Sequence, residues 1–334
     1  MRKKLLMVVS LMLVLTMLSA CGTGGSQTGE GGNSDTYTLK IGMVVTEQDP
    51  MYLGAMELKR NVEERTEGRL KVEVYPSSQL GDTKDIMEQA KVGANVAAIS
   101  DAALMSEIVP EIGVLAAPYV VDNYEEAEIL VTSDLFKGWY ENVADSGYRV
   151  LSFNWYQGDR HFMTNKLVET PEDLRGLRIR TPGSPIFIDS INAMGANATA
   201  LAWGEVYPGL QQRVIDGFEA QYPAIVGARL YETSKYIAKT GHFQLMSPLV
   251  VGNGFFESLP ADIQEILLEE AEKAGKYASE QTLNGLVQNE EDMKAQGVTI
   301  TEVDITAFKE ASESVYQKNN LQEAKAQVDA LLGK

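Results

Sequence analysis

Strand-like and helix-like segments alternate along most of this 334-residue chain. Residues 38–45 form an apolar run typical of a buried strand, and residues 51–62 then place apolar side chains at helical spacing. Residues 70–75 alternate between apolar and polar side chains, which is the period of a half-buried strand. A helix over 82–93 and a short strand over 96–100 follow. Strands that alternate with helices predict an α/β fold.

The same alternation returns in the second half of the chain. Residues 149–155 and 177–181 are predicted to be strands, and residues 185–194 a helix that Gly195 ends. A mature chain of about 300 residues exceeds the size at which a single hydrophobic core stops growing. We therefore expect two lobes of similar construction, each with its own sheet, although no sequence repeat between them is evident.

One helical segment is unusually long. It covers residues 259–297, with Pro260 at the start, where a helix tolerates proline, and Gly297 as the terminator. If continuous, it spans roughly 55 Å at about 1.5 Å per residue, which is longer than one lobe. Such a helix would brace both lobes. Gly275 and Gly285 allow a kink or a break, and two consecutive helices are the alternative.

The N-terminus has the pattern of a secretory signal peptide over residues 1–20. Three basic residues precede an apolar run of about 13 residues, which is too short to cross a bilayer. The letters LSAC then resemble the lipobox of bacterial lipoproteins, and Cys21 is the only cysteine in the chain. We expect cleavage before a lipid-carrying Cys21, followed by a flexible Gly/Ser/Thr tether over residues 21–36. A chance cysteine near a cleaved signal is the alternative.

Charge and motif content exclude several classes of function. Removing residues 1–20 leaves 26 of the 29 basic residues against 47 acidic ones, a net charge of −21. Such a surface does not favour nucleic acid or anionic lipid. The sequence has no HExxH, no GxSxG and no second cysteine, and His161 and His242 are interpreted as structural. No metal, no cofactor and no catalytic residues are predicted.

Two arginines are the best candidates for binding an anion. In the strand 177–181, Leu177, Ile179 and Thr181 share one face, and Arg178 and Arg180 share the other. Arg160 follows the strand 149–155. A guanidinium matches a carboxylate with two parallel hydrogen bonds, although a strand arginine can equally be a surface residue or a salt-bridge partner.

An aromatic residue adds to this set. Trp203 lies just before a helix that is predicted to begin near Glu205. Its indole is either part of the core or the flat wall of a ligand pocket.

Long blocks in the right order resemble the solute-binding proteins of tripartite ATP-independent periplasmic (TRAP) transporters. The resemblance runs from about Thr38 to Gly297 and beyond, and four blocks carry it: KVEVYPSSQLGDTKDIMEQAKVG, VPEIGVLAAPYVVDN, LRGLRIRTPGSPIFIDSINAMGANATALAWGEVYPGLQQRVIDGFE and FESLPADIQEILLEEAEKA. It implies two α/β lobes with mixed sheets, joined by crossing hinge strands and spanned by a long helix. Lobe I is expected to comprise 37–157 with 246–285, and lobe II to comprise 158–245 with 286–334.

The resemblance also implies site residues. Arg180 is expected to clamp a ligand carboxylate, Arg160 to add a second polar contact, and Trp203 to lie beside the ligand. Many relatives read DGxEN where this chain reads DGFEAQY, so Ala220 replaces a ligand-binding Asn. The lost amide is either replaced by Gln221 or Tyr222 or is not needed by the ligand. The predicted ligand contacts are completed by three residues: Asn154, Ser100 and Glu47.

The predicted function is therefore that of a non-enzymatic, monomeric, lipid-anchored extracytoplasmic receptor. It captures a small organic acid, with a sugar acid such as a hexuronate favoured, and delivers it to a TRAP membrane permease. A C4-dicarboxylate-binding receptor is the first alternative. A secreted α/β hydrolase and a receptor coupled to a sensor kinase or another transporter are further alternatives.

Overall fold

The computed structural model describes residues 36–334. The predicted signal peptide, Cys21 and the tether up to residue 35 lie outside the described residues. Strands and helices alternate as the sequence predicts. The expectation of a separate sheet in each lobe is wrong, because the long strands β4 and β8 join the strands into one mixed sheet in the order β2-β1-β3-β8-β4-β7-β5-β6, with β9 paired to β8. The strands of this sheet are β1 (Tyr37–Gly42), β2 (Leu70–Tyr75), β3 (Val96–Ile99), β4 (Tyr148–Thr164), β5 (Arg178–Thr181), β6 (Asn197–Ala200), β7 (Gly217–Gln221), β8 (Tyr236–Gly252) and β9 (Thr299–Glu302).

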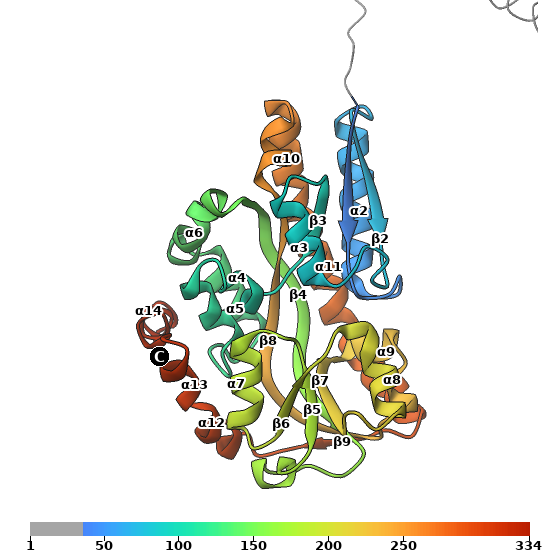
Figure 1. Cartoon of the computed structure of the whole chain (residues 1–334), viewed down its shortest axis with the longest axis vertical. Coiled ribbons are helices and arrows are strands. Elements are labelled where there is room, and N and C mark those ends of the chain that lie inside the picture. Colours follow the sequence, from blue (N-terminus) through green and yellow to red (C-terminus); the bar gives the residue numbers. More distant parts are fainter. Residues whose placement is uncertain (1–35) are drawn as a thin grey trace, which may run out of the picture. The chain divides into compact units, whose positions relative to one another are not determined.

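Two long strands join the two halves of the sheet (Figure 1). The strands β4 and β8 have 17 residues each and pair antiparallel along their whole length. Near its C-terminal end, β8 also pairs with β3, and near its N-terminal end with β9. The strand predicted over 149–155 therefore continues to Thr164. The β4–β8 register shifts on both sides of Asp159–Arg160, and Gly158 there has φ +111°, a backbone conformation that favours glycine.

Helices cover the sheet. Several begin with side-chain caps: Asp49 accepts from the backbone N–H of Met51 at 2.9 Å, and Asp82 and Asp85 form a capping box. The helical segments are α2 (Pro50–Arg65), α3 (Thr83–Lys91), α4 (Ala102–Met105), η1 (Pro110–Ala116), α5 (Tyr124–Thr132), α6 (Asp134–Tyr140), η2 (Glu141–Ser146), η3 (Pro171–Leu174), α7 (Pro185–Ala193), η4 (Trp203–Glu205), α8 (Val206–Gln211), α9 (Tyr222–Gly227), η5 (Leu230–Glu232), α10 (Asn253–Ser258), α11 (Ala261–Ala295), α12 (Thr306–Ser312), α13 (Ser314–Lys318) and α14 (Gln322–Leu332).

The long helix α11 is continuous. It covers 35 residues, so the alternative of two consecutive helices is wrong. Its first half packs apolar residues such as Ile263 and Leu267 into the core formed with β1, β2 and α2, and Met293 near its end belongs to the core around β7 and α9. The helix therefore braces both ends of the sheet, over roughly 52 Å. Gly275 does not break it, and β4 packs closely against this glycine: a Cβ there would lie 2.0 Å from the Asn154 Oδ1.

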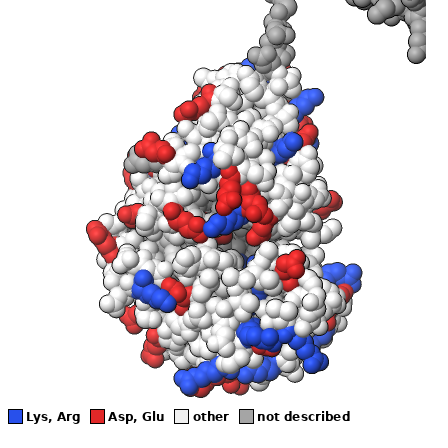
Figure 2. Space-filling view, viewed as in Figure 1, with Lys and Arg blue, Asp and Glu red and all other residues white. Residues whose placement is uncertain are grey.

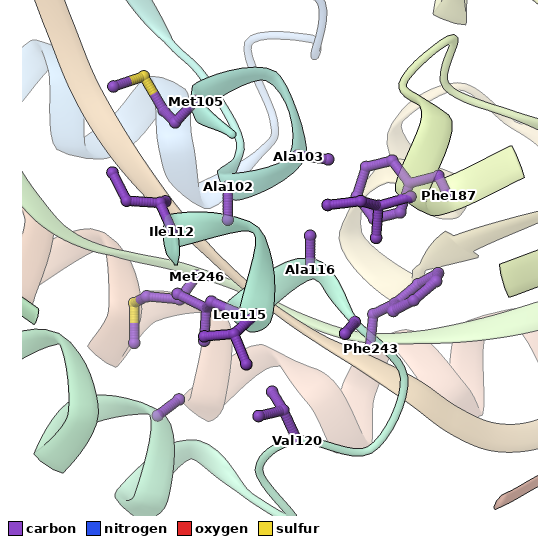
Figure 3. Packing of buried hydrophobic residues seen from close by; sticks show 14 of the residues in the cluster. Ala102, Ala103, Met105, Ile112, Leu115, Ala116, Val120, Phe187, Phe243 and Met246 are labelled. Atoms are coloured by element: carbon purple, nitrogen blue, oxygen red, sulfur yellow. The ribbon is translucent and has the colours of Figure 1, made fainter. Parts of the chain in front are cut away.

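A third apolar cluster lies on the other face of the β4–β8 pair. Figure 3 shows part of it, where side chains of α4 and η1 meet Phe187 of α7 and Phe243 of β8. The two phenylalanine rings are 5.0 Å apart in an edge-on arrangement. This cluster continues into α12–α14, whose Tyr316 hydroxyl donates to the Pro118 carbonyl at 2.6 Å. Within residues 36–334, no helix has the length and apolarity needed to cross a bilayer.

Candidate functional site

A cavity of about 430 Å³ opens between the two halves of the sheet. Figure 2 shows acidic and basic side chains clustered in the middle of one face, with a hollow beside them. The wall from the N-terminal half comprises Met43, Val44, Val45, Met51, Asp82, Thr83, Lys84, Ile99, Ser100, Asp101, Leu104 and Glu107. The opposite wall and floor comprise Gln157, Arg160, Arg180, Pro182, Gly183, Ser184, Phe187, Ala200, Leu201, Ala202, Trp203, Gln221, Ala224 and Leu245.

Arg180 is the one lining cation without an ion-pair partner among the described residues. Its side chain is only 4% exposed, and its Nε donates to the Leu201 carbonyl at 2.8 Å. The guanidinium lies over the Trp203 ring, 5.3 Å from the ring centroid. Burial lowers the pKa of Arg180 to about 10, although Glu219 acts in the opposite direction. The guanidinium remains charged at neutral pH and is held in the wall of the cavity.

Arg178 has the same strand face but a different environment. It is exposed, and its Nε and Nη2 donate to the two carboxylate oxygens of Asp216 at 2.9 and 2.8 Å. Its charge is therefore already compensated outside the cavity. The sequence leaves two interpretations open for an arginine on this strand. Arg178 is a salt-bridge partner, and Arg180 is a cation in the cavity wall.

Arg160 lines the cavity but is already paired. Its Nη2 donates to the Glu219 Oε1 at 2.6 Å and to the Glu219 carbonyl at 3.0 Å, and its Nε donates to the Glu219 Oε2. Both side chains are almost fully buried. Arg160 can still orient a ligand by hydrogen bonding, but it brings no uncompensated positive charge to the cavity.

Glu219 is held by two further residues. The Thr181 hydroxyl donates to its Oε1 at 2.8 Å, and the His242 Nε2 lies 3.7 Å from its Oε2. Burial alone would raise the pKa of Glu219, but Arg160 and His242 lower it to about 2. Burial lowers the pKa of His242 below its usual range. The predicted structural role of His242 is therefore consistent with its position behind the wall.

A chain of hydrogen-bonded side-chain amides extends from Arg160 across the floor of the cavity. Gln221 accepts from the Arg160 Nη1 at 3.4 Å and donates to the Gln157 Oε1 at 3.1 Å, and Gln157 donates to the Ser247 hydroxyl at 2.8 Å. Gln221 faces the cavity because it shares a strand face with Glu219. Ala220 faces the other way, into the apolar core around β7. Of the two replacements considered for the missing Asn, the structure places Gln221 in the cavity wall, whereas Tyr222 belongs to the core.

Two buried hydroxyls in the cavity wall have no hydrogen-bond partner among the described residues: Ser100 Oγ and Ser184 Oγ. Ser184 is also the N-cap of α7, yet it makes no capping bond. A buried hydroxyl without a partner is costly unless something else satisfies it, so a polar ligand is the natural partner. Ser184, Phe187 and Gln157 were missed from sequence. Ser184 could have been found as the N-cap candidate before Pro185.

Five of the seven predicted contacts line this cavity, and two do not. The five are Arg180, Arg160, Trp203, Gln221 and Ser100. Asn154 donates to the Glu272 carbonyl on α11 at 2.8 Å, and Glu47 is exposed in the loop before α2. Neither lies in the cavity wall. Within residues 36–334, no group of three or more His, Cys, Asp or Glu side chains is placed to hold a metal ion.

The chemistry of the cavity is that of recognition of a small anion. One end offers a fixed guanidinium beside an indole, and the rest offers amides, free hydroxyls and apolar side chains. In a partly buried site such a guanidinium is screened far less by salt than the acidic surface, since the Debye length is about 8 Å at physiological ionic strength. The charge of the cavity guanidinium, and not that of the acidic surface, therefore governs which ligand the cavity favours.

Comparison with known proteins gives matches along almost the whole described chain. Residues 41–323 match the family model described as bacterial extracellular solute-binding protein, family 7. A TRAP periplasmic solute-binding protein from Escherichia fergusonii, solved in an apo open form, is 38% identical. It covers 89% of this chain and 100% of its own, with a TM-score of 0.78.

Two similar structures contain ligands. A TRAP periplasmic solute-binding protein from Ochrobacterium anthropi with bound L-fuconate is 33% identical, covering 89% of this chain and 99% of its own, with a TM-score of 0.86. One from Actinobacillus succinogenes with bound L-galactonate is 30% identical, covering 87% and 99%, with a TM-score of 0.83.

Proposed function

The chain belongs to the bacterial extracellular solute-binding proteins of family 7, which are TRAP solute receptors, and we propose that its cargo is a monoanionic sugar acid held by Arg180. The observation that carries the proposal is the state of Arg180: a buried, charged guanidinium that lies in the cavity wall with no counter-ion among the described residues. Buried charges are normally paired, so the missing partner is a ligand carboxylate.

The charge of the cavity favours one carboxylate over two. Arg160 is neutralised by Glu219, and Lys84 lies 3.3 Å from Glu107. The wall opposite Arg180 contains Asp82 and Asp101, whose carboxylates would repel a second anionic group. A C4-dicarboxylate would therefore leave one carboxylate without a cation. A sugar acid avoids this, because everything beyond its single carboxylate is uncharged.

The remaining polar groups fit hydroxyls. Ser100 and Ser184 provide unpartnered hydroxyls, and Gln157 and Gln221 provide amides along the floor. Trp203 offers a flat apolar surface beside the carboxylate position, as is common where a sugar ring lies against protein. The L-fuconate and L-galactonate bound by the two relatives are acids of this class. We infer a hexonate or hexuronate as cargo.

The wider organisation is part of the same proposal. Lobe I comprises 37–157 with 246–285, and lobe II comprises 158–245 with 286–334, hinged where the β4–β8 register shifts. A monomeric receptor, anchored outside the cytoplasm by lipid on Cys21, delivers cargo to TRAP permease subunits without catalysing a reaction. The LSAC sequence and the Gly-rich segment after it support the anchor.

A ligand screen tests the cargo. Thermal-shift measurements on the chain without residues 1–20 should show stabilisation by one or more hexuronates or hexonates, followed by a dissociation constant from calorimetry. Succinate, malate and fumarate should stabilise it less. Stabilisation by dicarboxylates alone would overturn the proposed cargo. Replacing Cys21 with Ser should move the full-length protein from the membrane to the soluble fraction, and unchanged membrane association would contradict the lipid anchor.

A further inference from the structure

A second cavity, of about 330 Å³, lies on the opposite face of the same two long strands. In β4, Arg160 faces the first cavity, whereas its neighbours Asp159 and His161 line the second. In β8, Leu245 lines the first and Gln244 the second. Side chains of a strand alternate between faces, so the two cavities share one layer of backbone. The second cavity is lined by Tyr119, Val121, Asp122, Asp159, His161, Lys239, Thr240, Gly241, Gln244, Glu302, Val303 and Ile305.

The cation of this cavity is already neutralised. Lys239 pairs with Glu302 and lies 3.6 Å from a carboxylate oxygen of Glu290. Asp122, an acid of the wall, is paired in turn with Lys309 at 3.1 Å and Lys334 at 2.8 Å. Asp159 has no ion-pair partner among the described residues. An anionic ligand would therefore meet Asp159 and find no free positive charge, so anions are disfavoured.

His161 lines this cavity, and only one of its two ring nitrogens has a hydrogen-bond partner among the described residues. It is 5% exposed, and its Nδ1 accepts from the backbone N–H of Gly241 at 3.0 Å. Burial lowers its pKa to about 3, so the ring is neutral and its proton must be on Nε2. Among the described residues this N–H has no acceptor. The neutral ring therefore gives a ligand a hydrogen-bond donor and no charge.

Tyr119 provides the second unpartnered group. Its hydroxyl oxygen is buried and has no hydrogen-bond partner among the described residues. Its backbone is in the left-handed region, at φ 57°, which is costly for a bulky side chain. The backbone N–H of Tyr119 donates to the His242 carbonyl at 3.1 Å, which fixes this conformation. Strain of this kind persists at binding sites, where it presents a side chain in a required direction.

Acceptors lie beside these donors. The Tyr156 hydroxyl lies within hydrogen-bond distance of the Gln244 Oε1, at 2.7 Å, and of Asp159, and its single proton is donated to one of these two acceptors. The other carboxylate oxygen of Asp159, Oδ2, borders the open space beside Gly241. A Cβ atom added to Gly241 would have this oxygen as its nearest neighbour, at 3.8 Å. Planar acceptors next to N–H and O–H donors match the hydroxyl group, which both donates and accepts.

We propose that this second cavity binds a small uncharged polyhydroxyl compound, a polyol or neutral monosaccharide, between Asp159, His161 and Tyr119. Among the described residues the wall has no free positive charge for an anion. Burial raises the pKa of Asp159, which disfavours the charged form that would attract a cation. An apolar ligand would leave the mixed donors and acceptors of the wall without partners. This site does not depend on Arg180, which lines the other cavity.

The test uses a background in which the first cavity is disabled. In Arg180→Ala protein, calorimetry and saturation-transfer NMR with glycerol, myo-inositol and D-glucose should show binding of at least one of them. Tyr119→Phe and His161→Asn should each weaken that binding about tenfold, as expected for loss of one buried hydrogen bond. Tyr75→Phe is the matched control, because that exposed hydroxyl bonds only to Glu73 at 2.7 Å. It should have no effect.

The outcomes separate this site from the sugar-acid site. Circular dichroism and a cooperative melt establish that each variant is folded. Absence of binding up to 0.1 M of each compound, or crystals soaked in glycerol that show only water between Asp159 and His161, would overturn the second site. Retention of full affinity in the Tyr119→Phe, His161→Asn double variant would do the same. Neither result touches the sugar-acid proposal, which fails only on the acid screen of the parent protein.

Discussion

Arg160 and Glu219 form a buried ion pair in which both carboxylate oxygens of Glu219 accept from the guanidinium. The two residues lie on neighbouring strands, where Arg160 is in register with Gln221, two residues after Glu219. This pairing removes one positive charge from the cavity. It leaves Arg180 as the lining arginine whose charge a ligand can compensate.

The first prediction concerns affinity. Arg180→Ala should weaken binding of the carboxylate cargo by about 2–5 kcal/mol, or roughly 30- to 4,000-fold, because the ligand carboxylate loses its counter-charge in a buried site. Arg178→Ala is the matched control on the same strand face. Its exposed pair with Asp216 should contribute little, so affinity should stay within about twofold. Calorimetric titration distinguishes the two, and equal affinities of both variants would remove Arg180 from the site.

The second prediction concerns the stability of the ligand-free protein. Arg180→Met should leave the melting temperature unchanged or raise it, since it removes a desolvated charge that has no protein counter-ion. The same substitution abolishes the thermal shift given by cargo. Differential scanning calorimetry with and without ligand checks both. A large loss of stability without ligand would show that Arg180 is a structural residue.

The third prediction concerns the buried pair. Glu219→Gln should destabilise the fold by about 3–5 kcal/mol, because Arg160 is left buried without an anion. Thr181→Val, which removes only one hydrogen bond to Glu219, should cost about 1 kcal/mol. Urea unfolding measures both. If the Arg160→Met, Glu219→Leu double variant is no more stable than Glu219→Gln alone, the cost does not come from the unpaired arginine.

The fourth prediction concerns pH. His161 is neutral when folded, with its pKa lowered to about 3 from a usual value of 6.5. Below pH 6.5 the unfolded chain therefore binds a proton that the folded protein does not bind. Stability is full above that value and falls as the pH drops from 6.5 toward 3, by about 2 kcal/mol at pH 5. His161→Asn should flatten the dependence of unfolding free energy on pH in this range, whereas an unchanged slope would contradict the burial of a neutral ring.

The fifth prediction uses two glycines of the long helix. Gly275→Ala should cost about 1–3 kcal/mol, because its Cβ would lie 2.0 Å from the Asn154 Oδ1 and 3.0 Å from the Trp155 ring. Gly285→Ala should stabilise by about 0.5–1 kcal/mol, since its nearest neighbour is 3.7 Å away and alanine is the better helix former. Thermal melts give both values. Equal effects would show that β4 does not hold α11 at Gly275.

Much of the fold could be read from periodicity. The alternation of strands and helices, the helix ending near Gly297 and the strand carrying Arg180 each depend on side chains within a few residues of one another. The extent of β4 could not be read in this way. The predicted strand ends at Trp155, because the residues after it, with Gly158, do not alternate. Pairing with β8, and with β7 from Arg160 onward, keeps them extended to Thr164.

The sequence by itself determined the order of elements, the excess of acidic residues, a long helical segment near residues 259–297 and an arginine on the strand 177–181. Only the tertiary structure decided which arginine is free. Arg160 meets Glu219 from 59 residues away, Arg178 meets Asp216, and Asn154 turns to α11 while Gln221 turns to the cavity. Periodicity predicts which face of a strand an arginine occupies. The carboxylate that neutralises the arginine comes from a residue distant in sequence, so the ion pair exists only once the chain has folded.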